Sequence, residues 1–346
     1  MTHWKRLIAD SITTIGELET HFKMRFPDDM ELVLKRYPLR INPYYLSLIQ
    51  QIGDPLYLQA VPHLEEIAPC SFPNDPLNEA NLSPVSNLVH RYPDRALLLV
   101  SNQCAMYCRF CTRKRLVGKK HDVFSQRHLD EVVHYLRNEP QINELILSGG
   151  DPLLLEDHTL EAILSAIYAV PSIDVIRIGT RTPCTLPMRV TSELCKILQR
   201  FRPLYVNTHF NHPTELTKAA INACAKLVDY GIVLGNQTVL LKGINDDAKT
   251  ITTLMRALVK ARVKPYYLFQ IDITRGTRHF KTPLRTGFEI IKTMSGSVSG
   301  LAVPTFAVDS PGGKGKIPLF PDNSTLQGGY LEFKNFCGEV CRYPDN

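Results

Sequence analysis

The sequence contains no run of about 18 apolar residues, the length that a helix needs to cross a bilayer. We therefore predict no membrane span. A secretory leader is also missing from the first residues, so the nine cysteines are expected to be reduced thiols of a cytoplasmic protein. Disulfides are correspondingly not expected, and cysteines that cluster in the sequence become candidate metal ligands.

A strong excess of charge of either sign is also absent. The chain has 40 Lys and Arg residues against 34 Asp and Glu residues, a net charge of +6 over 346 residues. This mild excess is compatible with anionic cofactors and does not require nucleic acid as a partner. With 44% apolar residues, the chain can form one large domain with an appendage.

Three cysteines lie close together in the pattern C-x3-C-x2-C, at Cys104, Cys108 and Cys111. Thiolates at this spacing can bind three corners of a cubane iron–sulfur cluster and leave the fourth iron open to a small molecule. A structural zinc ion would need a fourth ligand, and this stretch offers no further Cys or His. Three unrelated buried cysteines are the remaining alternative. The pattern favours a cluster with one open iron.

The first part of the chain differs in character from the rest. Apolar residues recur at helical spacing between Ile12 and Phe22, which predicts helices within residues 1–52. Seven prolines between Pro55 and Pro93 argue against long helices and central strands, and predict an extended segment that wraps the main domain. We divide the chain into an N-terminal helical and proline-rich region (1–88), a core (89–303) and a C-terminal segment (304–346).

From about residue 95, short apolar runs alternate with longer amphipathic stretches. Alternation at a spacing of roughly 30 residues is typical of βαβ units in a parallel sheet. Six such units predict an α/β fold, a partial (β/α)6 barrel of the TIM type. Polar residues follow each predicted strand and should meet, because barrel sites lie at the C-terminal ends of strands. The predicted strands are residues 96–100, 144–147, 174–178, 204–206, 231–234 and 265–269.

Two glycine-containing motifs stand out. The stretch Ser148-Gly149-Gly150-Asp151 would present bare backbone N–H groups and a carboxylate to a ligand, although an ordinary turn has the same composition. Residues 309–318 are a glycine-rich loop that ends in Lys316 but lacks the residue order of a P-loop. A lysine on such a loop can form and release a Schiff base, the attachment chemistry of pyridoxal phosphate (PLP). A solvated surface loop is the alternative.

Taken together, these motifs resemble those of the lysine 2,3-aminomutase family. The three cysteines with Phe110 are similar to the signature of the radical S-adenosylmethionine (SAM) superfamily, to which that family belongs. The resemblance implies a radical SAM barrel, a [4Fe-4S] cluster on the cysteines, reductive cleavage of SAM to a 5′-deoxyadenosyl radical, and PLP as a second cofactor. It covers about residues 85–345 and depends on residues 90–95, 104–113, 148–151, 207–213, 235–237, 266–267, 279–283 and 311–316.

The same resemblance assigns roles to individual residues. It implies that Lys316 holds PLP, with Lys314 as a less favoured candidate, and that Arg91 and Arg95 contact the PLP phosphate. Arg113 would bind the substrate carboxylate. The residues implied for SAM are Ser148, Gly149, Gly150, Asp151, His209 and Gln237.

The predicted substrate follows from two carboxylates. The resemblance implies that Asp272 and Asp309 enclose the distal ammonium of the substrate. A neutral or acidic side chain would leave both unpaired, so lysine is favoured, while arginine also carries a distal cation. We therefore expect an L-lysine 2,3-aminomutase that forms β-lysine. Alternatives are the same reaction on arginine or another amino acid, or supply of β-lysine for modification of elongation factor P.

Two alternatives come from other classes. A nucleic-acid-modifying radical SAM enzyme would use the basic residues 113–115 with Lys119 and Lys120, although such a run is usually a solvated face. A non-catalytic iron–sulfur protein would leave the lysine loop unexplained. We expect a small-molecule substrate, an electron donor of the flavodoxin or ferredoxin type, and neither nucleic acid nor membrane as a partner. Whether the chain forms a homo-oligomer stays open.

A zinc site of the family is not expected here. The resemblance places a zinc-binding cysteine where this chain has Asp247, and others in a tail that extends beyond Asn346. Cys337 and Cys341 lie near the end of the sequence but do not match those ligands. The expected cofactors are therefore the [4Fe-4S] cluster, SAM and PLP, without zinc.

Overall fold

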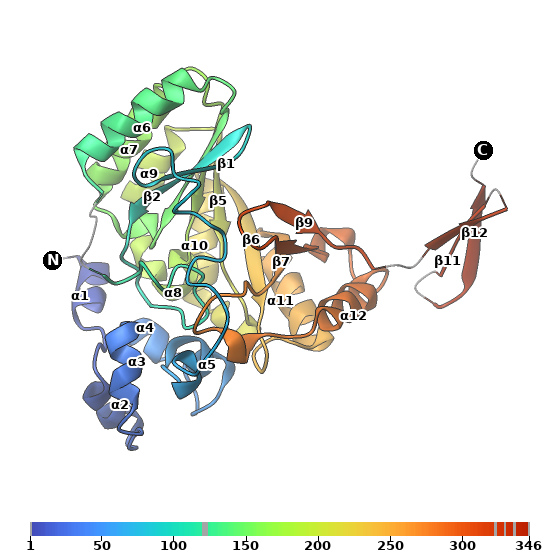
Figure 1. Ribbon diagram of the computed structural model, residues 1–346, viewed down its shortest axis with the longest axis horizontal. Coiled ribbons are helices and arrows are strands. Elements are labelled where there is room, and N and C mark those ends of the chain that lie inside the picture. The colour runs from blue at the N-terminus through green and yellow to red at the C-terminus, as the bar shows by residue number, and fades with distance from the viewer. Residues whose placement is uncertain (1, 120–123, 322–323, 329, 335–336, 345–346) are drawn as a thin grey trace.

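The computed structural model describes residues 2–119, 124–321, 324–328, 330–334 and 337–344. At its centre is a nine-stranded sheet in the order β1 to β9 (Figure 1). Strands β2 to β8 are parallel, and β1 and β9 pair antiparallel at the two edges. The strands are β1 Leu88–Tyr92, β2 Arg95–Ser101, β3 Glu144–Gly149, β4 Val175–Gly179, β5 Leu204–Thr208, β6 Val233–Leu240, β7 Lys264–Gln270, β8 Thr305–Asp309 and β9 Lys316–Pro318.

The six predicted strands are confirmed as β2 to β7, and the α/β barrel class with them. A seventh parallel strand, β8, extends the sheet with buried Phe306 and Ala307. The predicted C-terminal segment (304–346) contains this strand, which follows helix α12 (Leu284–Met294) as the earlier strands follow theirs. Strand β6 also continues to Leu240, so Gln237 lies within the strand and not after it.

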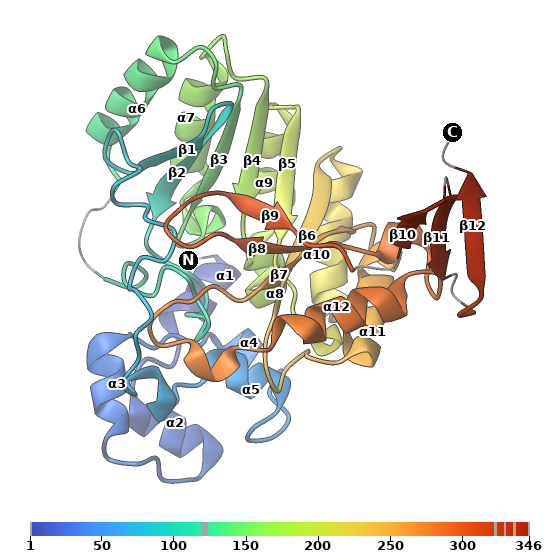
Figure 2. The same cartoon turned by 45° about the vertical axis from the view of Figure 1, so that its right-hand side comes forward.

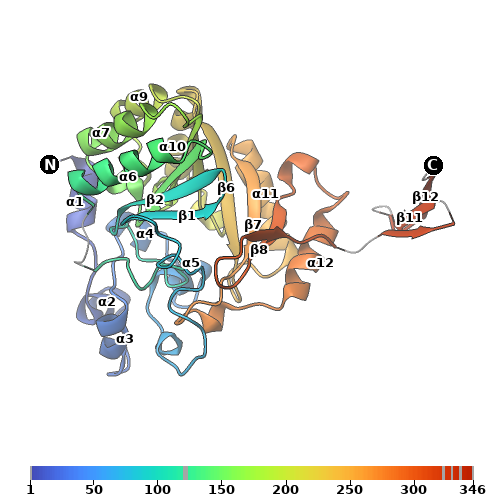
Figure 3. The same cartoon turned by 45° about the horizontal axis from the view of Figure 1, so that its top comes forward.

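Helices cover the outer face of the sheet, and the opposite face is left to the loops (Figures 2 and 3). Each helix buries one stripe; in α11 the buried residues Ile251, Leu254, Met255 and Leu258 follow the helical period. The covering helices are α6 Gln126–Asn138, α7 Asp157–Tyr168, α9 Ser192–Gln199, α10 Lys218–Asp229, α11 Ala248–Lys260 and α12 Leu284–Met294. Shorter elements in the loops are α8 Thr182–Thr185, η2 Pro152–Leu154, η3 Pro187–Arg189, η4 Pro213–Glu215, η5 Arg278–Phe280 and η6 Gly300–Ala302.

The N-terminal region is helical, as predicted, and lies below the barrel in Figure 1. Helix α2 begins after Thr14, which forms a capping box with Glu17. Ile12 lies outside this helix and forms a β-bridge with Ile41. The elements are α1 His3–Ala9, α2 Ile15–Phe22, α3 Met30–Arg36, α4 Pro43–Leu46, α5 Pro55–Ala60 and η1 Leu64–Glu66. An extended stretch then leads to β1.

Three strands near the C-terminus form a separate antiparallel sheet: β10 Ser324–Gln327, β11 Tyr330–Lys334 and β12 Val340–Pro344. This small sheet projects away from the main body (Figure 1). Within the described ranges, no helix is both long and apolar enough to cross a membrane.

Candidate functional site

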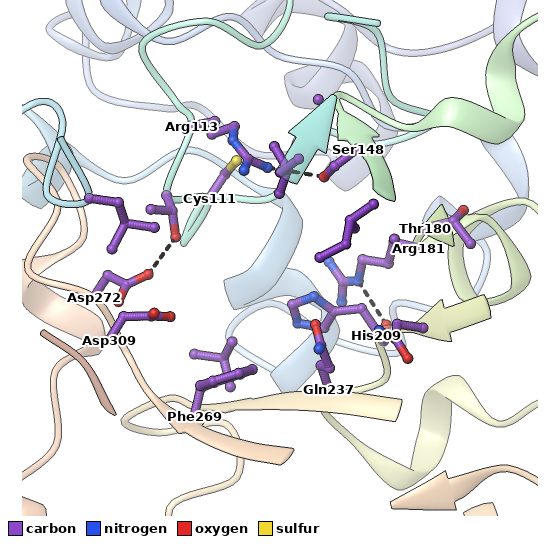
Figure 4. Close-up of a pocket in the computed structure, with 18 of the residues that line it drawn as sticks. Cys111, Arg113, Ser148, Thr180, Arg181, His209, Gln237, Phe269, Asp272 and Asp309 are labelled. Atoms are coloured by element: carbon purple, nitrogen blue, oxygen red, sulfur yellow. Dashed lines mark hydrogen bonds between the residues drawn. The ribbon is translucent and has the colours of Figure 1, made fainter. Parts of the chain in front are cut away.

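A cavity of about 640 Å³ lies where the loops meet the C-terminal ends of the strands. Every residue that the sequence predicted for a site lines it. Figure 4 shows Asp272 and Asp309 together on one side, and His209 and Gln237 on the other. The tertiary structure thus brings together residues from β1, β2 and β9, from the loop after β2, and from the ends of β3 and β5 to β8. Their individual roles remain predictions.

The three cysteines lie in the loop between β2 and α6, and all are free thiols. Burial, and then the negative charge of Cys108, raise the pKa of Cys111 to about 11. The pKa of Cys104 is likewise raised by burial, then by Asp151 and the other two cysteines. Cationic iron would offset this mutual repulsion and bind the sulfurs as thiolates. The donor set therefore fits a cluster.

The spacing of the ligands also bears on the kind of metal. Among the described residues, no three His, Cys, Asp or Glu side chains converge closely enough to hold a single metal ion. Sulfurs that bind separate irons of a cubane lie farther apart than the ligands of one ion. The arrangement of Cys104, Cys108 and Cys111 in one cavity is compatible with that wider spacing.

A buried ionic cluster anchors the cysteine loop to the N-terminal region. Glu66 accepts a hydrogen bond from Arg109 Nη2 at 2.6 Å and one from Lys114 Nζ at 2.7 Å. Although burial acts in the opposite direction, these two cations lower the pKa of Glu66 to about 2. Lys114 Nζ also donates to the Arg109 carbonyl at 2.6 Å, which closes the loop around Cys111.

The basic run 113–115 therefore does not form a solvated face. Lys114 is 5% exposed and pairs with Glu66. Arg113 and Arg115 both pair with Glu79, which is 3% exposed. This burial contradicts the use of residues 113–115 as a nucleic-acid contact surface. Lys120, the last residue of that predicted patch, lies outside the described residues.

The Gly-Gly motif lines the cavity but does not present all of the bare N–H groups that its composition predicted. The N–H groups of Gly150 and Asp151 are not bare, because they donate to the carbonyls of Ser101 at 2.5 Å and Gln103 at 2.7 Å. A Cβ at Gly149 would lie 2.3 Å from the Ser101 oxygen, and one at Gly150 would lie 2.4 Å from the Gln103 oxygen. The glycines allow β3 to touch the backbone that precedes the cysteines. They thereby fix the start of the cysteine loop.

Asp151 is similarly engaged within the protein. Its Oδ1 accepts hydrogen bonds from Thr180 Oγ1 at 2.6 Å and from the Leu153 N–H at 3.1 Å, and its Oδ2 accepts one from the Arg181 N–H at 2.8 Å. The side chain is 3% exposed. Asp151 therefore connects the end of β3 to η2 and to the residues that follow β4. Ser148, near the end of β3, lines the cavity.

His209 and Gln237 lie on the side of the cavity nearest Arg181 (Figure 4). Burial, and then the Arg181 cation, lower the pKa of His209 to about 3, so the imidazole is neutral at physiological pH. It contacts Asn211 Oδ1 at 3.0 Å. An irregularity in the pairing of β6 with β7 falls between Asn236 and Gln237. The extra residue, Tyr266, belongs to β7, so β6 keeps its alternation, and Gln237 and Val239, two residues apart, both line the cavity.

The two predicted substrate carboxylates share one region of the cavity. Asp272 accepts a hydrogen bond from Thr112 Oγ1 at 2.9 Å, and Asp309 pairs with Arg91 Nη1 at 3.1 Å. Burial, and then the negative charge of Asp309, raise the pKa of Asp272 to about 7. A cationic ligand between them would be paired with both, and would favour the ionised form of Asp272.

Arg113 lies at the other end of the substrate region. Its Nε and Nη2 donate to Glu79 Oε1 at 3.0 and 2.7 Å, and its Nη1 donates to Ser148 Oγ at 3.1 Å. A guanidinium has five N–H groups, so these three bonds leave one hydrogen on each terminal nitrogen. Those two hydrogens are suited to a carboxylate in the cavity. The proline-rich segment, which supplies Glu79, thus orients the predicted substrate-binding Arg.

The lysine loop is a β-hairpin that places Lys316 inside the cavity. Lys316 Nζ lies 4.7 Å from the ring centre of Tyr267 and 4.4 Å from that of Phe269, and its backbone N–H donates to Tyr92 Oη at 2.8 Å. Burial lowers the pKa of Lys316. Lys314 is exposed and does not line the cavity. The surroundings therefore fit PLP on Lys316: a lysine with a lowered pKa beside two flat aromatic faces.

The predicted phosphate contacts are near this hairpin. The guanidinium of Arg95 lies 3.8 Å from the ring centre of Tyr92, while Arg91 is engaged with Asp309. Arg177, which the sequence reasoning missed, also lines the cavity and pairs with Glu144. An anion would thus meet three cations, from β1, β2 and β4, each of which is paired with a carboxylate.

Glu79, Thr112, Arg177 and Arg181 were missed as site residues. Thr112 and Arg181 lie next to or within motifs already singled out, so their position after a strand or beside a cysteine could have indicated them. Arg177 falls in the middle of a predicted strand, where the inward-facing alternation was the available signal. Glu79 carries no local signal, because its partner Arg113 is 34 residues away.

Comparisons with known proteins agree with this geometry. The Radical SAM superfamily model matches residues 98–254, and the Lysine-2,3-aminomutase model matches residues 291–346. The L-lysine 2,3-aminomutase of Clostridium subterminale is 42% identical over 99% of this chain and 84% of that protein. That of Bacillus subtilis (strain 168) is 42% identical over 99% of this chain and 74% of that protein.

A third relative differs in its named substrate. The glutamate 2,3-aminomutase of Clostridioides difficile (strain 630) is 42% identical over 88% of this chain and 73% of that protein. Sequence identity alone therefore does not distinguish a lysine from a glutamate aminomutase. The charges in the cavity are the feature that can distinguish them.

Proposed function

Because the chain belongs to the lysine 2,3-aminomutase family of radical SAM enzymes, we propose that it converts L-lysine to β-lysine. The enzyme is an isomerase that depends on a [4Fe-4S] cluster, SAM and PLP. The reaction moves the α-amino group to the β-carbon. We also propose that a small flavodoxin or ferredoxin reduces the cluster in the cytoplasm, and that the chain divides functionally at residues 88 and 303.

One observation carries the choice of substrate. The cavity presents a guanidinium, Arg113, at one end and two carboxylates, Asp272 and Asp309, at another. Lysine has the complementary charges, with a carboxylate near its reacting carbons and an ammonium at its far end. Glutamate would bring a third carboxylate to the two aspartates, and like charges in a buried site are costly.

The protein residues position the reaction. When bound, the cluster and SAM supply a hydrogen-abstracting radical, and PLP supplies the electron-withdrawing group that carries the migrating nitrogen. Cys104, Cys108 and Cys111 would hold the cluster, and Lys316 would hold PLP covalently. The lowered pKa of Lys316 favours its neutral amine, which is the form that attacks a carbonyl carbon. Arg91 and Arg95 would hold the phosphate.

Orientation of the substrate follows from two fixed groups. Arg113 is held by Glu79 and Ser148, so a carboxylate bound to it has a defined position. Asp272 and Asp309 hold the far ammonium, which limits rotation along the lysine chain. Tyr267 and Phe269 present aromatic faces to the cavity beside Lys316.

The test offers L-lysine, L-arginine and L-glutamate separately to anaerobically reconstituted protein with SAM, PLP and a reductant. Mass spectrometry after derivatisation detects β-amino acids, and Cys104→Ala protein gives the background. We expect β-lysine alone. β-Arginine or β-glutamate as the main product would correct the substrate, and SAM cleavage without any β-amino acid would refute the proposed substrate site.

A further inference from the structure

We propose that Arg181 raises the reduction potential of the cluster by donating a hydrogen bond to the sulfur of Cys108. Arg181 follows β4 and its Nη1 lies 2.7 Å from Cys108 Sγ. The inference deepens the proposed function, since it assumes that the cluster is bound by Cys104, Cys108 and Cys111. Arg181 is a positioning and tuning residue in this scheme and does not itself react.

The guanidinium of Arg181 is fixed from several sides. Its Nη2 donates to Gln59 Oε1 at 2.6 Å and to Glu215 Oε1 at 2.7 Å, and its Nε donates to the His209 carbonyl at 3.3 Å. The guanidinium carbon lies 5.1 Å from the ring centre of Phe110. Arg181 is 8% exposed. Such an arrangement leaves the direction of the Nη1 donor little freedom.

The partner of Arg181 is held as firmly. Glu215 is fully buried, and its Oε2 accepts hydrogen bonds from the N–H groups of Asn211 at 2.6 Å and His212 at 3.0 Å. Tyr45 Oη donates to its Oε1 at 2.9 Å. The pair Arg181 and Glu215 is neutral as a unit. Its effect on the cluster is therefore local and comes from the N–H group directed at the sulfur.

The sign of the effect follows from electrostatics. Reduction adds one negative charge to the cluster, and a cationic N–H donor at a ligand sulfur stabilises that charge. Hydrogen bonds to the sulfurs are among the factors that set cluster potentials, and second-shell partners tune the metals that they surround. The low exposure of the site strengthens the interaction. Loss of the donor should therefore make the cluster harder to reduce.

The test is a reduction titration of the reconstituted cluster, followed by electron paramagnetic resonance in the absence of SAM. The variant R181M/E215Q removes both charges of the pair, so the net charge of the site is unchanged while the sulfur loses its donor. We expect at least a tenfold fall in the equilibrium constant for one-electron reduction, a shift of about 59 mV to more negative potential. Iron content is measured in parallel.

Two further variants serve as comparisons. Arg40 is also a cation beside the loop, but its Nη1 donates to the Cys104 carbonyl at 3.3 Å and not to a sulfur, so R40Q should shift the potential less. E215Q keeps Arg181 but removes its counter-charge, and should shift the potential upward. If the double variant does not retain a cluster, R181K decides, because it keeps a cation beside Glu215 but removes the guanidinium N–H that reaches Cys108 Sγ; an unchanged potential in R181K overturns the inference.

The outcomes separate the two proposals. An unchanged potential in R181M/E215Q with an intact cluster overturns the proposed role of Arg181 and leaves the proposed function standing. Because R181M/E215Q leaves the net charge unchanged and E215Q raises it by one, a shift of the potential in the same direction in both variants also overturns that role. Wild-type protein that binds no [4Fe-4S] cluster after reconstitution overturns both the inference and the proposed function.

Discussion

Asp309 and Lys316 lie directly opposite each other in the antiparallel pair of β8 and β9. Directly opposite residues project from the same face of a sheet, so both side chains reach the cavity. The predicted carboxylate for the substrate ammonium and the predicted PLP lysine thus belong to one hairpin. A slip of one residue in this register would turn Lys316 away from the cavity.

The first prediction concerns the identity of the PLP lysine. Lys316→Ala should lose covalent PLP but keep the iron and sulfide content of the wild type, because the Lys316 ammonium lies over Tyr267 and Phe269 of β7, while the cluster ligands come from the loop after β2. Borohydride reduction followed by peptide mass spectrometry will locate the pyridoxyl group. Lys314→Ala is the matched control and should retain it. A pyridoxyl group on Lys314 in the wild type would contradict the assignment.

The second prediction concerns the turn of the same hairpin. Gly312 and Gly313 have nearly equal φ values of +77° and +78°, but only at Gly313 would a Cβ collide with the protein, 2.4 Å from the Leu77 oxygen. Both alanine variants carry a penalty of about 1–2 kcal/mol for the left-handed backbone conformation. G313A should in addition displace the hairpin and weaken PLP binding at least tenfold, while G312A should bind PLP nearly as the wild type does. Equal PLP affinities in a fluorescence titration would refute the role of this contact.

The third prediction follows from the pKa of Asp272, raised to about 7. The folded protein favours the protonated carboxyl, whereas the unfolded chain ionises near its ordinary value of about 3.9. The folded state therefore loses stability as the pH rises through this window, by on the order of 2 kcal/mol between pH 5 and pH 7. Asp272→Asn should remove this loss. The free energy of unfolding of the variant minus that of the wild type should therefore increase from pH 5 to pH 8. Denaturant unfolding of both cofactor-free proteins at each pH measures this difference.

The control for this experiment is Asp247→Asn. Burial acts in the opposite direction, but hydrogen bonds from Thr250 lower the pKa of Asp247, so this carboxyl is ionised at both pH values. Its loss should cost the same stability at pH 5 and at pH 8. A pH-independent difference between Asp272→Asn and the wild type would show that Asp272 does not titrate in this range.

The fourth prediction tests the role of Glu79. In Glu79→Gln a single acceptor oxygen must serve Arg113 and Arg115, so Arg113 should lose its two-point attachment. We expect lysine to bind about tenfold more weakly, about 1.4 kcal/mol, and lysinol, which lacks the carboxylate, to be affected little. Calorimetric titration of variant and wild type measures the ratio of their dissociation constants for lysine and for lysinol. Asp75→Asn is the control, since Asp75 pairs with Arg115 but not with Arg113. Equal weakening of lysine and lysinol would assign Glu79 a structural role.

Local patterns were sufficient for six strands of the core and for the three cysteines, whereas the other predicted site residues were singled out by the resemblance to the family. The six strands β2 to β7 were predictable because buried parallel strands have continuous apolar runs. The three cysteines were recognisable from their spacing alone. Lys316 could be preferred over Lys314 from the family pattern, and the cavity contains Lys316 but not Lys314. The charges of Arg113, Asp272 and Asp309 similarly allowed the substrate to be predicted from the sequence.

The partners of those residues were decided by the tertiary structure. Arg181 and Cys108 are 73 residues apart, and Arg91 and Asp309 are 218 residues apart, so no local period connects them. The glycines at 149 and 150 were interpreted as open to a ligand, but they allow close contact with the backbone at Ser101 and Gln103.

The sequence by itself therefore determined which groups are present and roughly where each strand ends, because composition and periodicity are local properties. Only the tertiary structure decided how those groups are oriented and charged. A guanidinium such as Arg113 has the same chemistry anywhere in the chain, but its direction and free hydrogens depend on Glu79 and Ser148. The pKa of Asp272 likewise depends on burial and on Asp309, which the packing of β8 beside β7 brings near.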